Sequence, residues 1–114
     1  MSEPGHEKQR RFERVNLPEG KRLICQATGE GLALDGEVSV LGLGGMYIRA
    51  AAAQPVGSRV AIRMRNIADV VEADCVVRDS RPEGFGVEFL ELRPKFRRNL
   101  ERILARLKEP KGAG

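Results

Sequence analysis

The chain has 114 residues, of which 41% are hydrophobic and 32% are charged, and its formal net charge is +4. This length suits one domain whose core is large enough to be stable without disulfides or metal ions. No apolar run approaches the roughly 20 residues that span a bilayer, and the polar start MSEPGHEKQRR lacks the apolar segment of a secretory signal. We therefore expect a cytoplasmic protein without membrane insertion.

The residue types that catalysis or metal binding requires are scarce. Cys25 and Cys75 lie in apolar surroundings far apart in the sequence, and the single histidine, His6, lies in a polar segment. We expect both cysteines to be reduced and buried as small hydrophobic residues, with a disulfide as the alternative. No metal-ligand spacing and no nucleophile beside a base is present, so we expect neither a metal site nor an enzyme.

The first half of the chain predicts short strands broken by turns. A first strand is expected over residues 22–27 (RLICQA). Residues 32–41 contain Asp35-Gly36, a signal for a hairpin or a bulge, followed by a strand over EVSV. Inward and outward residues alternate over 46–50 (MYIRA), which predicts a strand with one buried face.

The second half continues the pattern with turns at Pro55–Ser58 and Arg81–Gly84. Residues 59–65, 71–78 and 85–92 predict three further strands, and the regular spacing favours an antiparallel sandwich or barrel. The residues expected to face inward from the first two of these strands are Val60, Ile62, Met64, Val71, Ala73, Cys75 and Val77.

One helix is predicted over about residues 94–108, since Pro94 suits a first helical position. Its apolar residues recur at helical spacing and form one stripe. They are Phe96, Leu100, Ile103, Leu104 and Leu107. We expect the stripe to cover an end or a flank of the barrel, with a partner helix as the alternative. The ends of the chain, 1–7 and 109–114, predict a flexible lead and a flexible tail.

Positive charge gathers in two segments, Lys8–Arg14 and Arg93–Lys108. Such clusters suit an anionic, phosphate-bearing partner, and solvated surface charge is the alternative, which we prefer for the second segment. The first segment places Arg10, Arg11 and Arg14 just ahead of the first strand. Guanidinium groups there can donate paired hydrogen bonds to phosphate oxygens and stack on purine rings.

Three segments, RRFERV, GSRVAIRM and GFGVEFLEL, occur in an order that resembles the PilZ domain over residues 8–107. The resemblance implies an all-β fold with one C-terminal α-helix, a six-stranded antiparallel β-barrel. It also implies a non-enzymatic regulatory module that binds the bacterial second messenger cyclic di-GMP. In the family, paired arginines of the first motif hold phosphates and stack on guanine. This role carries over to Arg10 and Arg14, with Arg11 as an auxiliary.

The family's second motif is Asp or Asn, any residue, Ser, any two residues, then Gly, and it is degenerate here. In the ungapped register Gly45 is the terminal glycine and Gly44 completes the glycine pair, whereas Val40 and Gly42 replace the two polar residues. A second register, formed by Glu37, Ser39 and Gly42, has Glu in place of Asp and inserts three residues before MYIRA, so we prefer the first. The glycines let the backbone approach a ligand, but the side chains that would hydrogen-bond to guanine are lost.

Three functions are compatible with these observations. The first is a cyclic di-GMP receptor with weakened binding that acts as an adaptor on an unidentified protein partner. The second is a divergent PilZ module that binds no nucleotide and works through protein contacts, in motility or type IV pili. The third, a barrel for single-stranded nucleic acid, is disfavoured because only four Phe, one Tyr and no Trp are available for base stacking. We favour the first, as a monomer or homodimer.

Overall fold

Seven β-strands and one α-helix make up the part of the chain that this computed structural model describes, residues 14–18 and 21–108. In chain order they are β1 (Arg14–Asn16), β2 (Ile24–Gly29), β3 (Leu32–Gly42), β4 (Gly45–Arg49), β5 (Arg59–Asn66), β6 (Asp69–Arg81), β7 (Gly84–Glu91) and α2 (Pro94–Lys108). The turns between β4 and β5 and between β6 and β7 fall at the two Pro- and Gly-containing segments that predicted them.

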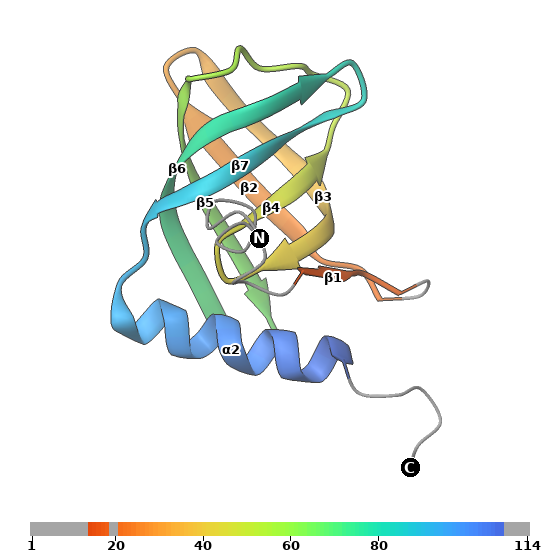
Figure 1. Ribbon diagram of the computed structural model, residues 1–114, viewed down its shortest axis with the longest axis vertical. Helices are drawn as coiled ribbons and strands as arrows, with labels where there is room; N and C mark the ends of the chain where they lie inside the picture. The colour runs from red at the N-terminus through yellow and green to blue at the C-terminus, as the bar shows by residue number, and fades with distance from the viewer. Residues whose placement is uncertain (1–13, 19–20, 109–114) are drawn as a thin grey trace, which may run out of the picture.

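The strands close into a barrel with the order β1-β3-β2-β5-β6-β7-β4, because β3 also pairs with β4 (Figure 1). All the pairings are antiparallel. The long strand β3 carries β4 on one edge, while its other edge pairs first with β2 and then with the short strand β1. Strands β2 to β7 thus form the six-stranded antiparallel barrel with a C-terminal helix that was predicted.

The inward-facing residues of β5 and β6 fill the barrel, as their alternation predicted. Val60, Ile62 and Met64 are 2–3% exposed, and Val71 and Val77 are fully buried. The register of β6 against β7 shifts twice, between Asp74 and Cys75 and between Val77 and Asp79. Between these shifts three consecutive residues are buried, where strict alternation would bury only two. Such bulges bend a strand and increase its twist, which helps a sheet close on itself.

Both cysteines are free and buried, so the prediction of reduced thiols is confirmed. Cys25 on β2 and Cys75 on β6 each point into the core. Loss of hydration raises the pKa of both thiols to about 12, and the negative charges of Asp35 and Asp74 add to the effect. At neutral pH they therefore behave as small hydrophobic residues.

The prediction of a hairpin or bulge at Asp35-Gly36 is wrong. Gly36 lies inside β3 and is paired with Cys25, and the hairpin turns earlier, where Gly31 has a φ of 70°. The bulge of β3 lies later, between Val38 and Val40. Gly36 is needed for packing instead, because a Cβ there would lie 2.3 Å from Cγ2 of Ile48. Only a contact between distant segments reveals this reason.

Helix α2 lies across one end of the barrel in Figure 1 and closes the core there. Leu100 and Ile103 are fully buried, and Leu104 and Leu107 are nearly so. The apolar stripe is therefore satisfied within the chain, and the alternative of a partner helix is wrong. Among the described residues, no helix is both long enough and apolar enough to cross a bilayer.

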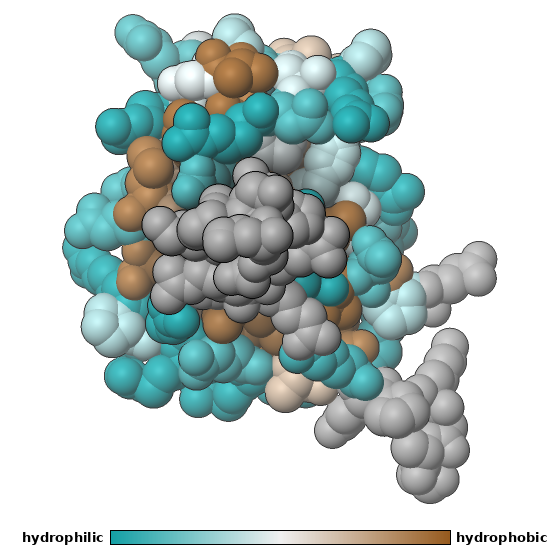
Figure 2. Space-filling view, viewed as in Figure 1, coloured by the Kyte–Doolittle hydropathy of each residue, from teal (hydrophilic) through white to brown (hydrophobic). Residues whose placement is uncertain are grey.

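The outer surface is mainly hydrophilic. On the face shown in Figure 2, hydrophobic residues gather chiefly in a band at the left, over β6 and the end of β7. The large hydrophobic side chains that remain exposed in the described part are Ile24, Val56, Ile67 and Leu90. The most exposed is Ile67, at 74%, in the turn between β5 and β6.

Candidate functional site

The first arginine motif meets the second motif through the pairing of β1 with β3. Arg14 is exposed at the start of β1, and its Cα partner is Gly42, the last residue of β3. Two residues later, Asn16 is the partner of Val40. Arg10 and Arg11 lie outside the described residues. The structure thus places Arg14 beside the two positions where the degenerate motif has lost its polar side chains.

The second register of the motif has a different environment. Glu37 lies toward the middle of β3, and its carboxylate is 3.7 Å from Arg22 and 3.5 Å from Arg49. The Ser39 carbonyl accepts a hydrogen bond of 2.9 Å from the N–H of Leu17. Glu37 is therefore engaged by two arginines and lies away from Arg14, whereas Val40, the first position of the ungapped register, lies opposite Asn16 of β1. Gly42, opposite Arg14, belongs to both registers.

Gly44 lies in the connection from β3 to β4, Gly45 is the first residue of β4, and both contact β7. The carbonyl of Gly44 accepts a hydrogen bond of 2.9 Å from the N–H of Phe89. A Cβ on Gly45 would lie 2.2 Å from the carbonyl oxygen of Val87, far inside contact distance. Gly45 is thus required by the close approach of two strands. Sequence reasoning assigned it only to ligand approach and missed this structural role.

Val40 occupies the position of the expected Asp or Asn and is half-buried. Its cross-strand partner on β4 is Tyr47, whose partner on β7 is Gly86. The Tyr47 hydroxyl is buried, with no hydrogen-bond partner among the described residues. The hydroxyl lies over Gly84, where an added Cβ would be 3.1 Å from it. Motif reasoning did not single out Tyr47, because its position matters only through the two cross-strand pairings.

The negative charge next to the glycine pair is already compensated. Glu88 is the Cα partner of Gly45 on β7, and its carboxylate accepts a hydrogen bond of 2.7 Å from Nε of Arg78. Arg14 has no ion-pair partner among the described residues, so its guanidinium remains available on the surface. This arrangement leaves the local field favourable to an anion.

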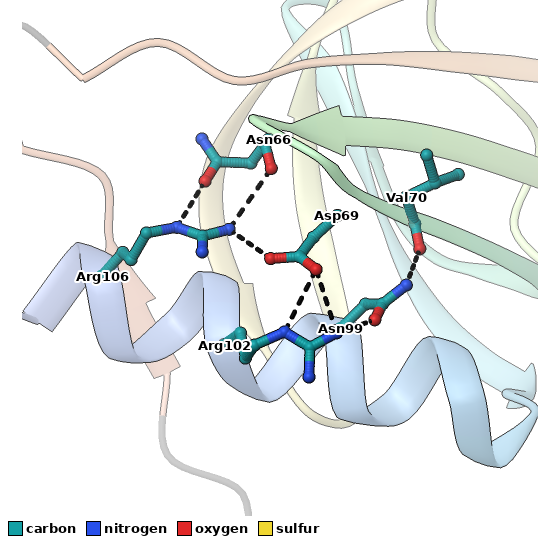
Figure 3. Close-up of polar contacts among 6 residues, drawn as sticks. All are labelled: Asn66, Asp69, Val70, Asn99, Arg102 and Arg106. Atoms are coloured by element: carbon teal, nitrogen blue, oxygen red, sulfur yellow. Dashed lines mark hydrogen bonds and ion pairs between the residues drawn. The ribbon is translucent and has the colours of Figure 1, made fainter.

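The second basic segment is not simply solvated charge, and this part of the prediction is wrong for Arg102 and Arg106 (Figure 3). Nη2 of Arg106 lies 2.7 Å from Oδ2 of Asp69, and Nε and Nη2 of Arg102 lie 3.1 and 3.0 Å from Oδ1. Hydrogen bonds from Arg102 and then Arg106 lower the pKa of the Asp69 carboxyl. Asp69 is only 13% exposed, so these contacts tie α2 to the start of β6.

Two asparagines complete this junction. Oδ1 of Asn66 accepts a hydrogen bond of 2.9 Å from Nε of Arg106. Asn99 donates one of 2.8 Å from Nδ2 to the carbonyl of Val70 and also contacts Arg102. In Figure 3, Asn99, Arg102 and Arg106 reach from one face of α2 toward the residues around the β5–β6 turn.

Residues 14–18 and 21–108 contain no group of three or more His, Cys, Asp or Glu side chains placed to hold a metal ion. A groove of about 430 Å³ runs over the outside of β2, β5 and β6 near the start of α2. Its lining mixes small apolar residues with charged ones and does not include the Arg14 region.

Comparison with known proteins agrees with the fold. The family model of the PilZ domain matches residues 8–106. The solved PilZ domain with c-di-GMP of YcgR from Escherichia coli superimposes with a TM-score of 0.68 at 26% identity, covering 87% of this chain and 91% of that one.

Two longer structures share the fold. YcgR in complex with c-di-GMP from Escherichia coli matches with a TM-score of 0.67 at 26% identity, over 87% of this chain and 46% of that one. The Bacillus subtilis inhibitor of motility, MotI/DgrA, matches with a TM-score of 0.67 at 17% identity, over 85% of this chain and 50% of that one. The chain thus spans about half the length of these two proteins. None of the curated proteins compared with it gave a match. Since the family model covers most of the sequence, this chain belongs to the PilZ domain family.

Proposed function

We propose that this chain is a non-enzymatic regulatory module that binds cyclic di-GMP with weakened affinity and transmits its presence to a protein partner in the bacterial cytoplasm. The observation that carries the proposal is the pairing of Arg14 with Gly42, which joins the two motifs at one surface. The similar YcgR domain was solved with c-di-GMP, which supports the same ligand class here.

Arg14 is the described residue that we assign to the phosphates. Its guanidinium is exposed and can donate two parallel hydrogen bonds to a phosphate oxygen pair. The carboxylate of Glu88, opposite Gly45, is paired with Arg78, which reduces repulsion of an anionic ligand near the glycine pair. Arg10 and Arg11 complete the arginine set in this proposal.

Weakened affinity follows from the second motif. Val40 and Gly42 can neither donate nor accept side-chain hydrogen bonds, so the polar edge of a guanine facing them loses its partners. A buried polar group left without a partner costs roughly 1–3 kcal/mol. Two such losses lower the affinity by about tenfold or more, since each 1.4 kcal/mol corresponds to a factor of ten.

A second function is favoured by one specific observation, the apolar pairing of Val40 with Tyr47. A half-buried valine beside an aromatic ring suits packing more than nucleotide recognition. In this case the chain is a protein-interaction module that binds no cyclic di-GMP, related to motility or type IV pili.

Calorimetric titration with cyclic di-GMP at low and moderate salt distinguishes these functions. We expect saturable heat from the natural sequence, and none from the variant that combines Arg10→Ala with Arg14→Ala, at an unchanged melting temperature. Arg59→Ala on β5 is the matched control, because it removes an exposed arginine far from β1 in the barrel order. Absence of heat up to about millimolar ligand would reject nucleotide binding and support the second function.

A further inference from the structure

The turn between β5 and β6 exposes an isoleucine that does little for the stability of the fold. Ile67 is 74% exposed and has a φ of 59°. A positive φ is rare in β-branched residues, because the side chain crowds the backbone in that region. Glycine or asparagine would suit the turn better. An exposed, strained isoleucine is better explained by a contact with another surface than by folding.

The turn that carries Ile67 is held rigidly from both sides. Asn66, just before it, accepts hydrogen bonds from Arg106 at its side-chain oxygen and at its carbonyl, of 2.9 and 3.3 Å. Asp69, just after it, is bound by Arg106 and Arg102 (Figure 3). A side chain presented from a fixed turn loses little conformational freedom on binding, which favours association.

The same hairpin carries the groove of about 430 Å³ on its outer face. Ala61 and Phe96 supply its apolar side chains, since Ala73 points into the core. Its charged residues are the acidic Glu72, Asp74 and Glu91 and the basic Arg63 and Arg93.

Two of these carboxylates lack a counter-charge. Asp74 on β6 and Glu91 on β7 are direct cross-strand partners, and neither has an ion-pair partner among the described residues. Like charges placed opposite each other on adjacent strands destabilise a sheet. Glu72, in contrast, is paired with Arg63 at 3.0 Å. This side of the groove is therefore complementary to a cation supplied from outside.

Cations border the Ile67 turn. Arg65 is exposed on β5, immediately before the turn, and has no ion-pair partner in the described part of the chain. Arg102 and Arg106 lie on its other side. The turn thus presents an apolar side chain with a basic border, whereas the groove presents Ala61 and Phe96 together with the unpaired carboxylates of Asp74 and Glu91.

The two surfaces are also placed to meet. Asp74 lies five residues along β6 from Asp69, which corresponds to about 17 Å at the usual rise of a strand. The turn and the groove lie on the same hairpin. In a dimer with two-fold symmetry, the turn of each copy can therefore contact the groove of the other, so that the same contact forms twice.

We propose that the groove is occupied by the β5–β6 turn of a second copy of this chain. In the dimer, Ile67 of each copy packs against Phe96 and Ala61 in the other, and Arg65 pairs with Asp74. The contact is small compared with standard interfaces, so the dimer is weak, reversible and sensitive to salt. It does not depend on nucleotide binding.

Sedimentation velocity over about 5–500 µM protein at low salt tests the assembly. We expect a dimer that grows with concentration and dissociates when salt is added. Ile67→Asn should weaken it by about tenfold or more, since each dimer loses two buried side chains, while folding stability is kept because Asn tolerates a positive φ. Val56→Asn is the matched control, as Val56 is 62% exposed in another turn. A monomer at every concentration, or equal effects of the two variants, overturns the proposal.

A charge exchange tests the pairing itself. Arg65→Asp and Asp74→Arg should each abolish the homodimer, because like charges then meet at both contacts. An equimolar mixture of the two variants should dimerise again. The aspartate introduced in one variant then faces the arginine introduced in the other at one contact, and the native pair is restored at the second contact. Arg59→Asp on the same strand should leave the dimer unchanged. Failure of the mixture to recover, with both variants folded, overturns the proposal.

Discussion

Asp69, the first residue of β6, lies 2.7 Å from the guanidinium of Arg106, 37 residues later on α2. The same carboxylate binds Arg102 one turn earlier on the helix. One residue of the barrel thus fixes both the position and the rotation of α2, whose buried leucines close the core. The β5–β6 turn becomes rigid as a consequence.

Replacing Asp69 by Asn should lower the melting temperature at neutral pH, because two arginines lose their charged partner. The lowered pKa of Asp69 means that its ion pairs stabilise the fold above its unfolded-state pKa, near 4, and are lost as pH falls through the folded-state pKa. The difference between the natural protein and Asp69→Asn should therefore shrink as pH is lowered below about 4. Thermal unfolding followed by circular dichroism across pH measures this.

Asp79→Asn is the matched control for that experiment. Asp79 also pairs with an arginine, Arg81, but both side chains are more than half exposed. Exposed pairs contribute only about 0–1 kcal/mol. An equal loss of stability in both variants would contradict the special role of Asp69.

Gly45→Ala should destabilise the barrel by about 1–3 kcal/mol, because the added methyl group would overlap the carbonyl oxygen of Val87. Gly86→Ala provides the comparison, since a Cβ there meets its nearest atom at an ordinary 3.5 Å. Urea unfolding of the two variants gives the difference directly. Similar stabilities would show that the β4–β7 approach relaxes easily, and would return Gly45 to a role in ligand binding alone.

Val40→Asp combined with Gly42→Ser should raise the affinity for cyclic di-GMP by about tenfold or more, because two hydrogen-bonding side chains return beside Arg14. The change restores the polar residues of the motif in the ungapped register. Glu37→Asp, which restores the aspartate of the other register, should have no such effect, since this position is engaged by Arg22 and Arg49. Calorimetric titration decides between them, and a gain only in the second variant would reverse the assignment.

The thiols of Cys25 and Cys75 should be inert to Ellman's reagent in the native protein at pH 8. With the pKa of each raised to about 12, the reactive thiolate is scarce, and burial also blocks access. Both should react fully in denaturant, where the pKa returns to near 8.5. The raised pKa also means that stability present below this unfolded-state value is lost as pH rises toward 12. Rapid reaction of the folded protein would show that one of these strands opens to solvent.

Local patterns in the sequence were sufficient for the helix and for most of the strands, but they missed the short strand β1, which lies ahead of the first expected strand. Alternation over Val60, Ile62 and Met64 correctly identified the buried face of β5, because a strand places successive side chains on opposite sides. Pro94 identified the start of α2, and the spacing of the five apolar residues after it identified the inner face, because residues three and four apart lie on one side of a helix. The ordered motifs identified the family.

Contacts between distant residues decided the rest. Gly36 is a turn signal in the sequence, yet it lies inside a strand. A glycine is needed there because the side chain of Ile48 occupies the space of a Cβ. Arg106 reads as solvated charge, yet it binds Asp69, and no local pattern links positions 37 residues apart. The meeting of Arg14 with Gly42 likewise depends on β1 pairing with the free part of one edge of β3. Sequence periodicity determines which way a side chain points, whereas only the closed barrel determines what it meets.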